Sequence, residues 1–293
     1  MEENMRKNDE RRLLVPARAG AEVARRHGLL CEAPTNWDDP SVAQCMELLY
    51  TAHAPFVWEG RLNIGAIHGD YQAFSLKVIS DYIERARDFP SVRTIVLHPS
   101  PRLWNETAGV EHPLEQVGDY GLFIVALQGL AKQASDLGLD LVLENNRAYW
   151  KDIPEEDSYQ PAKHDDNVRE YFATSPEQWA QVPEDVGAAN VGLCLDTSHA
   201  TTYAHRFPRQ QRLAVVERYL ELGGERIWHV HWNDNTPDEG SGREDRHLAL
   251  GRGTLPRAFH RRLWTCAGVR SFTLERWMDE ETLAAELAFV RGL

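Results

Sequence analysis

Short runs rich in leucine and β-branched residues recur along the chain, and longer amphipathic stretches separate them. The runs lie at residues 13–16, 29–33, 64–67, 94–97, 140–143, 191–195, 227–231 and 271–274. Each run has the length of a buried strand and ends in polar or turn-forming residues. The pattern therefore predicts eight buried strands.

The stretches between the runs have the spacing of helices. The helical patterns lie at residues 74–87, 114–137, 209–222 and 281–290. Strands that alternate with helices form a parallel sheet with helical crossovers, and eight of them can close a barrel. We therefore predict an α/β fold, a (β/α)8 TIM barrel with eight parallel strands. The alternative is an open doubly wound sheet, which would usually carry a GxGxxG loop after an early strand. The sequence has no such loop there.

The length of 293 residues suits one such barrel, which runs about 250 residues. Since no low-complexity linker divides the chain, we predict a single domain over residues 1–293, with residues 1–12 disordered. The segment 151–181 is rich in charge, proline and tyrosine and follows the fifth predicted strand. It is predicted to be an insertion on the face where barrel active sites lie, either a lid or a surface excursion.

The net charge of −13 changes the picture of possible partners. An acidic chain has no overall basic field that would attract nucleic acid or an anionic membrane. The four cysteines form no CxxC pair, and the charged N-terminus lacks the apolar core of a signal peptide. We expect a cytoplasmic protein that acts on a small molecule rather than on nucleic acid or a membrane. The oligomeric state is left open.

Histidine, aspartate and glutamate residues gather at the ends of the predicted strands. They are His68, His98, Glu144, Asp196, His199, His229, His231 and Glu275, with Asp245 and His247 in the loop after the seventh strand. One such residue alone is commonly a packing residue or a helix cap. In a barrel, however, the carboxyl ends of all strands converge on one mouth, where active sites lie. The whole set is therefore expected to meet there.

This combination of side chains points to a metal. Several carboxylates in one place repel one another and resist ionisation unless a cation neutralises them. Imidazole together with carboxylate suits zinc, manganese or iron. His229 and His231 are two residues apart and point to the same face of their strand. His231 is nearer the mouth and is the expected ligand, whereas His229 is expected to lie in a barrel layer or beside a ligand.

The stretches LDTSHA, HWND and DRHLALGRG closely resemble the xylose isomerase-like barrel superfamily, which includes sugar isomerases, epimerases and endonuclease IV. The resemblance covers roughly residues 60–290 and implies one to three divalent ions. It implies a first ion on His68, His98 and Glu144, a second on Glu144, Asp196, His231 and Glu275, and a third on His199, Asp245 and His247. The second set is also the single-metal site of the superfamily's isomerases and epimerases.

Residues beside these ligands depart from endonuclease IV. Glu144 is followed by Asn-Asn-Arg, where that enzyme typically has Asn-Thr-Ala-Gly, and Glu275 is followed by Arg-Trp instead of Thr-Pro. Tyr71 sits at the position of a tyrosine that contacts DNA in the family, but the usual Leu-Ile-Asn-Leu segment is absent. These departures weaken the expectation of DNA repair more than that of metal binding.

Aromatic and cationic side chains follow several of the predicted strand ends. The predicted substrate-binding residues are Tyr71, Trp104, Arg147, Trp150, Trp232, Arg246, Arg252 and Trp277. Flat rings suit stacking on a sugar face or a base, and guanidinium groups suit a phosphate or carboxylate. The alternatives are that the tryptophans pack over the barrel mouth and that some arginines pair with the clustered acids.

Two mechanisms fit these residues, and the predicted catalytic residues are Glu144, Glu275 and His199. In a sugar isomerase or epimerase, which ranks first, the metal is a Lewis acid and the two glutamates move the proton. His199 and Arg246 would then bind oxygens of a sugar-like, anionic substrate. In a multinuclear phosphodiester hydrolase, which ranks second, Glu144 would bridge two ions. Other metal-dependent lyase or oxidase chemistry, or a barrel that only binds, ranks third.

Overall fold

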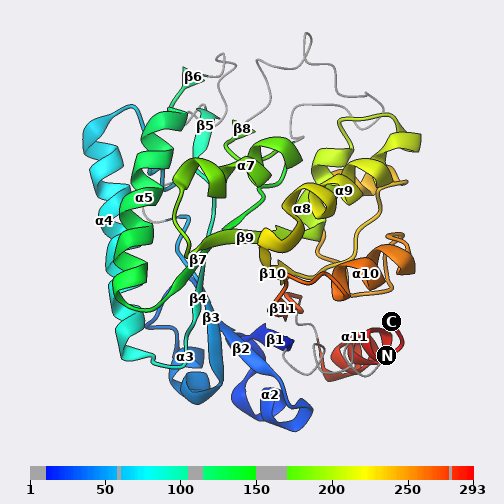
Figure 1. The fold of residues 1–293 in the computed structure, drawn as a ribbon. Coiled ribbons are helices and arrows are strands. Elements are labelled where there is room, and N and C mark those ends of the chain that lie inside the picture. The colour runs from blue at the N-terminus through cyan, green and yellow to red at the C-terminus, as the bar shows by residue number, and fades with distance from the viewer. Residues whose placement is uncertain (1–10, 58–60, 105–114, 150–169, 277–278) are drawn as a thin grey trace, which may run out of the picture.

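Eight parallel strands form a closed barrel in the computed structural model, so the predicted TIM-barrel fold is confirmed (Figure 1). The structure describes residues 11–57, 61–104, 115–149, 170–276 and 279–293. The barrel strands are β1 (Arg12–Pro16), β2 (Leu30–Ala33), β3 (Leu49–His53), β4 (Thr94–Leu97), β7 (Asp140–Glu144), β9 (Val191–Asp196), β10 (Ile227–His231) and β11 (Ser271–Thr273). They follow the order β1-β11-β10-β9-β7-β4-β3-β2 around the barrel.

The third barrel strand is not where the sequence pattern put it. The strand expected at residues 64–67 is wrong, because β3 is Leu49–His53 and pairs with β2 and β4. Ile64 is buried, but its backbone N–H donates to the Ser100 hydroxyl at 2.9 Å instead of to a neighbouring strand. The apolar run at 64–67 therefore reflects a buried connection that leads into the next helix.

Helices cover the outside of the barrel (Figure 1). They are α2 (Ala21–His27), α3 (Pro40–Cys45), α4 (Gly69–Arg85), α5 (Tyr120–Asp136), α7 (Pro176–Val186), α8 (Thr197–Ala204), α9 (Arg209–Gly223), α10 (Arg257–Trp264) and α11 (Glu280–Arg291). Single 3-10 turns are η1 (Ala17–Ala19), η2 (Met46–Leu48), η3 (Ala86–Asp88), η4 (Gly224–Arg226) and η5 (Gly240–Arg243). No helix in the described part of the chain is long and apolar enough to cross a membrane.

Side-chain caps fix where several of these helices begin. Asp119 accepts the Leu122 N–H at 2.9 Å, so α5 begins at residue 120, later than the apolar pattern suggested. Asp196, the last residue of β9, caps α8 in the same way by accepting the His199 N–H at 2.7 Å. Since a carboxylate on the first-turn N–H groups stabilises a helix start, Asp196 is held rigidly at the mouth.

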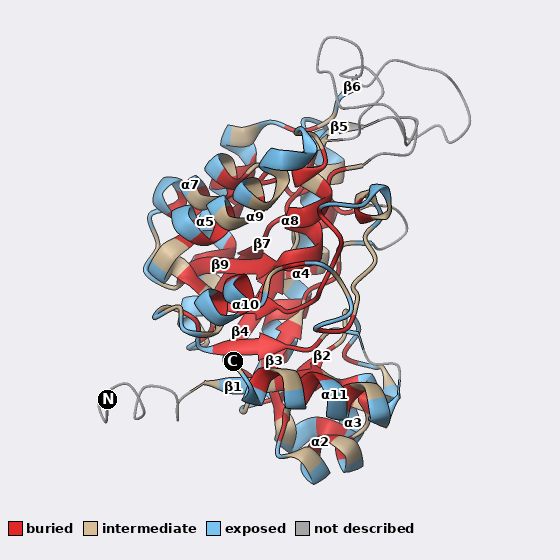
Figure 2. Ribbon diagram, turned by 90° about the vertical axis from the view of Figure 1, so that its right-hand side faces the viewer, coloured by how far each residue is buried: buried red, intermediate tan, exposed pale blue. Residues whose placement is uncertain are grey.

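The core lies between the barrel and the helices, and the barrel strands are almost entirely buried (Figure 2). Every residue of β4 and of β9 is buried. Trp179 of α7 is fully buried and donates its indole N–H to the Leu143 carbonyl of β7 at 2.9 Å. Helix packing of this kind fixes the strand ends that carry the polar residues.

A small second sheet stands at the carboxyl end of the barrel (Figure 1). It consists of the antiparallel strands β6 (Glu115–Gln116), β5 (Pro101–Trp104) and β8 (Glu170–Tyr171), in that order. The end of the predicted insertion 151–181 supplies β8 and the first part of α7, whereas residues 151–169 lie outside the described residues. A lid in this segment therefore stays a prediction.

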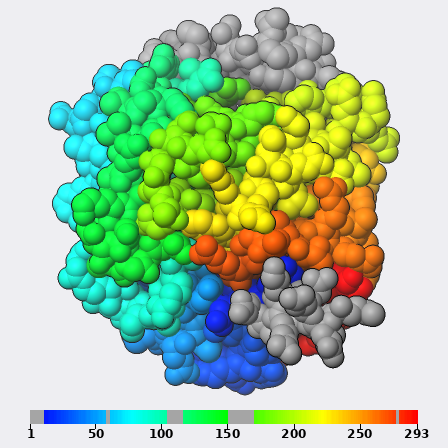
Figure 3. Space-filling view, viewed as in Figure 1, coloured from blue at the N-terminus to red at the C-terminus, as the bar shows by residue number. Residues whose placement is uncertain are grey.

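The two ends of the chain meet to close the barrel. β1 pairs with β11, with Arg12 opposite Ser271 and Leu14 opposite Thr273. Figure 3 shows the N-terminal elements in blue and the C-terminal helix in red on the same lower side of the molecule. Residues 1–10 lie outside the described residues, and Arg12, predicted to be disordered, already belongs to β1.

Candidate metal centre

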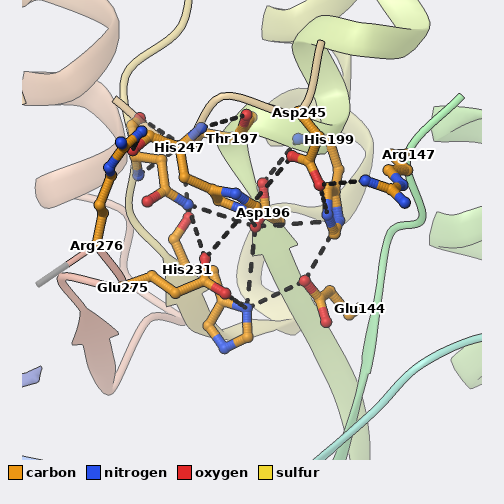
Figure 4. A network of polar contacts seen from close by, with 12 residues as sticks. Glu144, Arg147, Asp196, Thr197, His199, His231, Asp245, His247, Glu275 and Arg276 are labelled. Atoms are coloured by element: carbon orange, nitrogen blue, oxygen red, sulfur yellow. Dashed lines mark hydrogen bonds and ion pairs between the residues drawn. The ribbon is translucent and has the colours of Figure 1, made fainter. Parts of the chain in front are cut away.

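Glu144 faces His199 and His231 at the barrel mouth (Figure 4), and His53 and His98 lie on its other side. The carboxylate is 1% exposed at the end of β7, and its Oε1 lies 3.0 Å from His231 Nδ1 and 3.3 Å from His199 Nδ1. Its other oxygen, Oε2, lies 2.9 Å from His98 Nε2 and 3.5 Å from His53 Nε2. Four imidazole rings from four different segments thus surround one carboxylate.

A second group of ligand-type side chains adjoins the first through Asp196 (Figure 4). Asp196 Oδ2 lies 3.2 Å from His247 Nε2 and 4.0 Å from His231 Nδ1. His247 Nε2 also lies 3.3 Å from Glu275 Oε2, and His199 Nε2 lies 3.3 Å from Asp245 Oδ2. The His199 Nδ1–H donates to the Asn145 carbonyl at 2.8 Å, which leaves Nε2 to face Asp245.

His68 is not part of this arrangement. It is exposed at the N-terminus of α4, because the chain segment that precedes it is a connection and not a strand. His53, the last residue of β3, stands beside His98 and Glu144 instead. The signal for His53 was present in the sequence as a histidine that ends the short run Leu-Tyr-Thr-Ala. We therefore correct His68 to His53 in the set of candidate ligands.

The arrangement fits divalent cations. Three overlapping groups have ligand atoms within 4.8 Å of one another: His53, His98 and Glu144; Glu144, Asp196 and His231; and Asp196, His199 and His247. Two buried oxygens, Glu144 Oε2 and Asp245 Oδ1, accept no well-aligned hydrogen bond among the described residues and face only imidazoles, His98 Nε2 at 2.9 Å and His247 Nε2 at 3.4 Å. A buried carboxylate oxygen without a well-aligned donor is costly, and a cation would relieve that cost. The roles of the individual residues as ligands stay predictions.

The carboxylates and imidazoles of the centre shift the pKa values of one another toward their charged forms. Burial opposes ionisation of Glu144, but His98 and His231 outweigh burial and hold the pKa of Glu144 well below its usual value. Burial likewise disfavours the charged form of His199, yet Asp196 and Asp245 raise the pKa of His199 well above its usual value. Protons on His199 and His231, whose pKa values are both raised, therefore compensate the carboxylates, whereas burial lowers the pKa of His98 to about 4. Metal ions would compete with those protons.

Glu32 is a buried acid near this centre that the sequence patterns did not single out. It lies on β2, and its Oε1 is 3.2 Å from His231 Nε2, on the side of the ring opposite Glu144. Thr51 of β3 donates its hydroxyl to Glu32 Oε2 at 2.8 Å. A single acid inside the apolar run Leu-Leu-Cys-Glu-Ala gives no sequence signal of its own. Sequence periodicity does suggest its inward orientation once the strand is known.

A pocket of about 170 Å³ opens onto the centre. Its lining combines ligand-type side chains with two arginines and two aromatic rings: His53, Phe56, Arg61, His98, Glu144, Asn146, Arg147, Tyr149, His199, Asp245, His247 and Glu275. Arg147 Nη1 lies 3.2 Å from Asp245 Oδ2, and its guanidinium lies 4.8 Å over the Tyr149 ring. The Arg61 guanidinium lies 5.3 Å over the Phe56 ring. The pocket is thus acidic at its base and cationic in its wall.

Of the predicted substrate-binding residues, Arg147 lines the pocket and Trp232 does not. Trp232 is fully buried, stacks on Trp264 with ring centroids 5.6 Å apart, and donates its indole N–H to His260 Nδ1 at 3.1 Å. Its predicted contact with substrate is therefore wrong. The alternation along the strand explains the error, because a residue next to the inward-facing His231 points outward to the helices.

The other predicted substrate contacts lie elsewhere or are not described. Tyr71 lies in the first turn of α4, where its hydroxyl donates to the Arg61 carbonyl, and it does not line the pocket. Arg252 is exposed and is likewise absent from the pocket wall, and the Arg246 carbonyl accepts from the Arg276 guanidinium. Trp104 ends β5. Trp150 and Trp277 lie outside the described residues.

The fold and this site define an eight-stranded parallel barrel with a candidate metal centre at its carboxyl end. A family model described as the xylose isomerase-like TIM barrel matches residues 42–293, and the chain belongs to that family.

Two relatives and one solved structure illustrate the similarity. The uncharacterised protein MJ1311 of Methanocaldococcus jannaschii is 25% identical over 235 residues, which is 78% of this chain and 66% of that protein. A probable endonuclease 4 of Mycobacterium leprae is 26% identical over 226 residues, 76% of this chain and 71% of that protein. The crystal structure of a D-tagatose 3-epimerase-like protein superposes with a TM-score of 0.65 at 20% identity, covering 96% of this chain and 98% of that one. The last comparison supports the fold.

Proposed function

We propose that this protein is a metal-dependent hydrolase that cleaves a phosphate ester of a small, sugar-like molecule. The observation that supports this proposal is the convergence of nine ligand-type side chains in overlapping groups that share Glu144 and Asp196. The single-metal site of an epimerase, as the resemblance implies it, needs four of them. The other residues, which include both His53 and His98, would then have no chemical role.

Glu275 and Arg147 would have different roles in this reaction. Bound divalent ions would supply Lewis-acid polarisation of a phosphoryl oxygen. Glu275 is the most accessible carboxylate of the centre at 29% exposure, and the Asn233 amide fixes it by donating to its Oε2 at 2.9 Å. Glu275 is therefore placed to accept a proton from a water that attacks phosphorus at the pocket floor and to return it to the alcohol oxygen that leaves, while Arg147 faces the same space and offsets the charge of Asp245.

Metal content together with a matched pair of histidine variants tests the proposal. Protein purified without chelator should carry close to three zinc ions per chain by elemental analysis. His53→Ala should lose about one ion and most of the hydrolysis of small phosphate esters, since His53 stands beside His98 and Glu144. His68→Ala is the control and should keep both, since His68 is exposed on α4. A single ion per chain that survives in His53→Ala would contradict the proposal.

The two arginines of the pocket wall support an anionic substrate. Arg61 and Arg147 both line the pocket, and both lower the pKa of Tyr149 despite its burial, which marks a positive potential at that ring. Charge-assisted hydrogen bonds from arginine suit a phosphate group. Arg61→Ala should weaken competitive inhibition by inorganic phosphate about tenfold, the effect of one such bond. Arg252→Ala, which is exposed and outside the pocket wall, should leave it unchanged.

Isomerisation or epimerisation of a sugar is the second candidate. The supporting observation is that two glutamates flank one imidazole nitrogen, with His231 Nδ1 3.0 Å from Glu144 Oε1 and 3.9 Å from Glu275 Oε1. Two carboxylates on either side of a substrate carbon can remove and return a proton. Exchange of a carbon-bound hydrogen of a ketose or ketose phosphate with deuterated water would identify this reaction. Hydrolysis without such exchange would exclude it for the substrates tested.

A further inference from the structure

Glu32 crosses the interior of the barrel to reach the histidines of the opposite wall. It lies on β2, whereas His229 and His231 lie on β10, and β1 and β11 stand between these two strands. The carboxylate is 6% exposed. Its Oε2 lies 3.1 Å from His229 Nε2, and its Oε1 lies 3.2 Å from His231 Nε2. One buried acid therefore contacts both imidazoles of the same strand.

Other polar groups hold Glu32 in this position. The Thr51 hydroxyl donates to Oε2 at 2.8 Å, and the Thr273 hydroxyl lies 3.4 Å from the same oxygen. His229 is fixed in turn, because its Nδ1 lies 2.7 Å from the Ser271 hydroxyl while its Nε2 faces Glu32. A carboxylate with this many partners in a closed barrel has a defined orientation.

The geometry assigns Glu32 the role of a positioning residue for His231 as a metal ligand. His231 has two ring nitrogens, and Nε2 faces Glu32 while Nδ1 faces Glu144 at 3.0 Å. An Nε2–H that donates to Glu32 leaves the Nδ1 lone pair directed at the candidate metal centre. Such a carboxylate behind a ligating imidazole fixes the tautomer and makes the nitrogen a stronger donor. This inference rests on the proposed function, because it requires a metal at Nδ1.

Zinc affinity measured against a chromophoric chelator tests the assignment without use of enzyme activity. Glu32→Gln keeps the size of the side chain and removes its charge. It should weaken the binding of the ion nearest His231 by about 10- to 100-fold, the usual effect of losing such a partner. Glu286→Gln is the matched control, because it makes the same change at a buried glutamate of α11, which accepts the Leu250 N–H instead of contacting a histidine. Its zinc affinity should stay within about threefold of the unmodified protein.

Two outcomes would overturn the assignment. Zinc affinity in Glu32→Gln equal to that of the unmodified protein, with both folded by circular dichroism, would show that Glu32 is only a packing residue. The proposed function would survive that result. Absence of zinc binding in the unmodified protein would instead remove the proposed function and the assignment together.

If Glu32→Gln does not fold, nuclear magnetic resonance of the unmodified protein tests the assignment instead. Zinc-loaded protein with ¹⁵N-labelled histidine reports which ring nitrogen carries the proton, and comparison with His231→Gln identifies the signal. We expect a protonated Nε2 and a metal-bound Nδ1 for His231. A proton on Nδ1 and a metal on Nε2 would overturn the assignment.

Discussion

Two carboxylates at the carboxyl end of the barrel are buried to the same degree but have opposite surroundings. Asp234, shortly after β10, accepts backbone N–H groups from Asn235 at 2.9 Å, Gly251 at 3.0 Å and Leu255 at 3.2 Å. Glu144, at the end of β7, is surrounded by imidazoles, and its Oε2 faces His98 at 2.9 Å without a well-aligned hydrogen bond. Backbone N–H groups satisfy the first carboxylate, whereas the second has only titratable imidazoles around it.

The difference separates an acid that anchors backbone from an acid that is a candidate metal ligand. Backbone N–H groups around Asp234 fold the loop at residues 248–255 back onto the barrel. The packing there is so close that a Cβ on Gly253 would lie 2.3 Å from both the Asn235 carbonyl oxygen and Asp234 Oδ1. That loop follows directly on Asp245 and His247. Asp234 therefore holds in place the segment that brings Asp245 to His199 and His247 to Asp196.

Glu144→Gln should have the largest effect on turnover. The amide keeps the shape of the side chain but is neutral. It therefore cannot serve as the anionic metal ligand that two of the candidate groups share. We expect the rate to fall by about a thousandfold or more, which corresponds to ~4 kcal/mol of transition-state stabilisation. Steady-state rates measured at equal zinc concentrations, with circular dichroism as a check on folding, provide the measurement. Retained turnover would remove Glu144 from the centre under either candidate mechanism.

Asp234→Ala should affect folding more than chemistry. Several backbone N–H groups would lose a charged acceptor in a buried place, and we expect the free energy of unfolding to fall by about 3 kcal/mol in urea titrations. Asp279→Ala is a suitable comparison, because Asp279 also accepts a backbone N–H, from Thr282 at 2.7 Å, but is exposed. Loss of an exposed cap should cost about 1 kcal/mol. Equal losses in the two variants would argue against Asp234 as the anchor of the loop.

Glu286→Gln should have a smaller effect that depends on pH. Glu286 of α11 accepts the Leu250 N–H of the same loop at 3.0 Å, and burial raises the pKa of its carboxyl from 4.5 to about 7, with Leu250 opposing the shift. Between these values the folded state holds a proton that the unfolded state has released. The free energy of unfolding therefore falls as the pH rises through this window.

Glutamine at position 286 cannot ionise. The free energy of unfolding of the variant should therefore not show this decrease with rising pH. We expect its stability relative to the unmodified protein to increase by roughly 3 kcal/mol between pH 4.5 and pH 8. Urea titrations at both pH values give the difference. Parallel pH profiles for the two proteins would show that the pKa of Glu286 is the same in the folded and unfolded states.

The sequence predicted the barrel because seven of its strands are runs of apolar residues that alternate with helices. It failed at β3, because Leu-Tyr-Thr-Ala-His is less apolar than the connection around Ile64 that follows it. The same error moved the expected histidine from position 53 to position 68. Trp232 was misplaced because its position just after a strand end predicts a place at the mouth, whereas the alternation that directs His231 inward turns Trp232 toward the helices.

Glu32 and Asp234 could not be separated from ordinary polar residues by pattern alone. Glu32 contacts His231, a residue 199 positions away, and such a contact exists only after the barrel has closed. Asp234 stands in the HWND stretch beside a candidate ligand, yet its oxygens serve backbone N–H groups of a later loop. The contacts of each acid are thus set by closure of the barrel, which brings distant residues together, and not by the local sequence.

The pairing of β11 with β1 also has a consequence for biosynthesis. The ribosome delivers β11 and Glu275 after the other seven barrel strands, so until then β1 and β10 are open edges. Unpaired edges invite association with other chains. A nascent chain that stops before β11 has neither a closed barrel nor Glu275. Assembly of the full candidate metal centre would thus follow synthesis of β11.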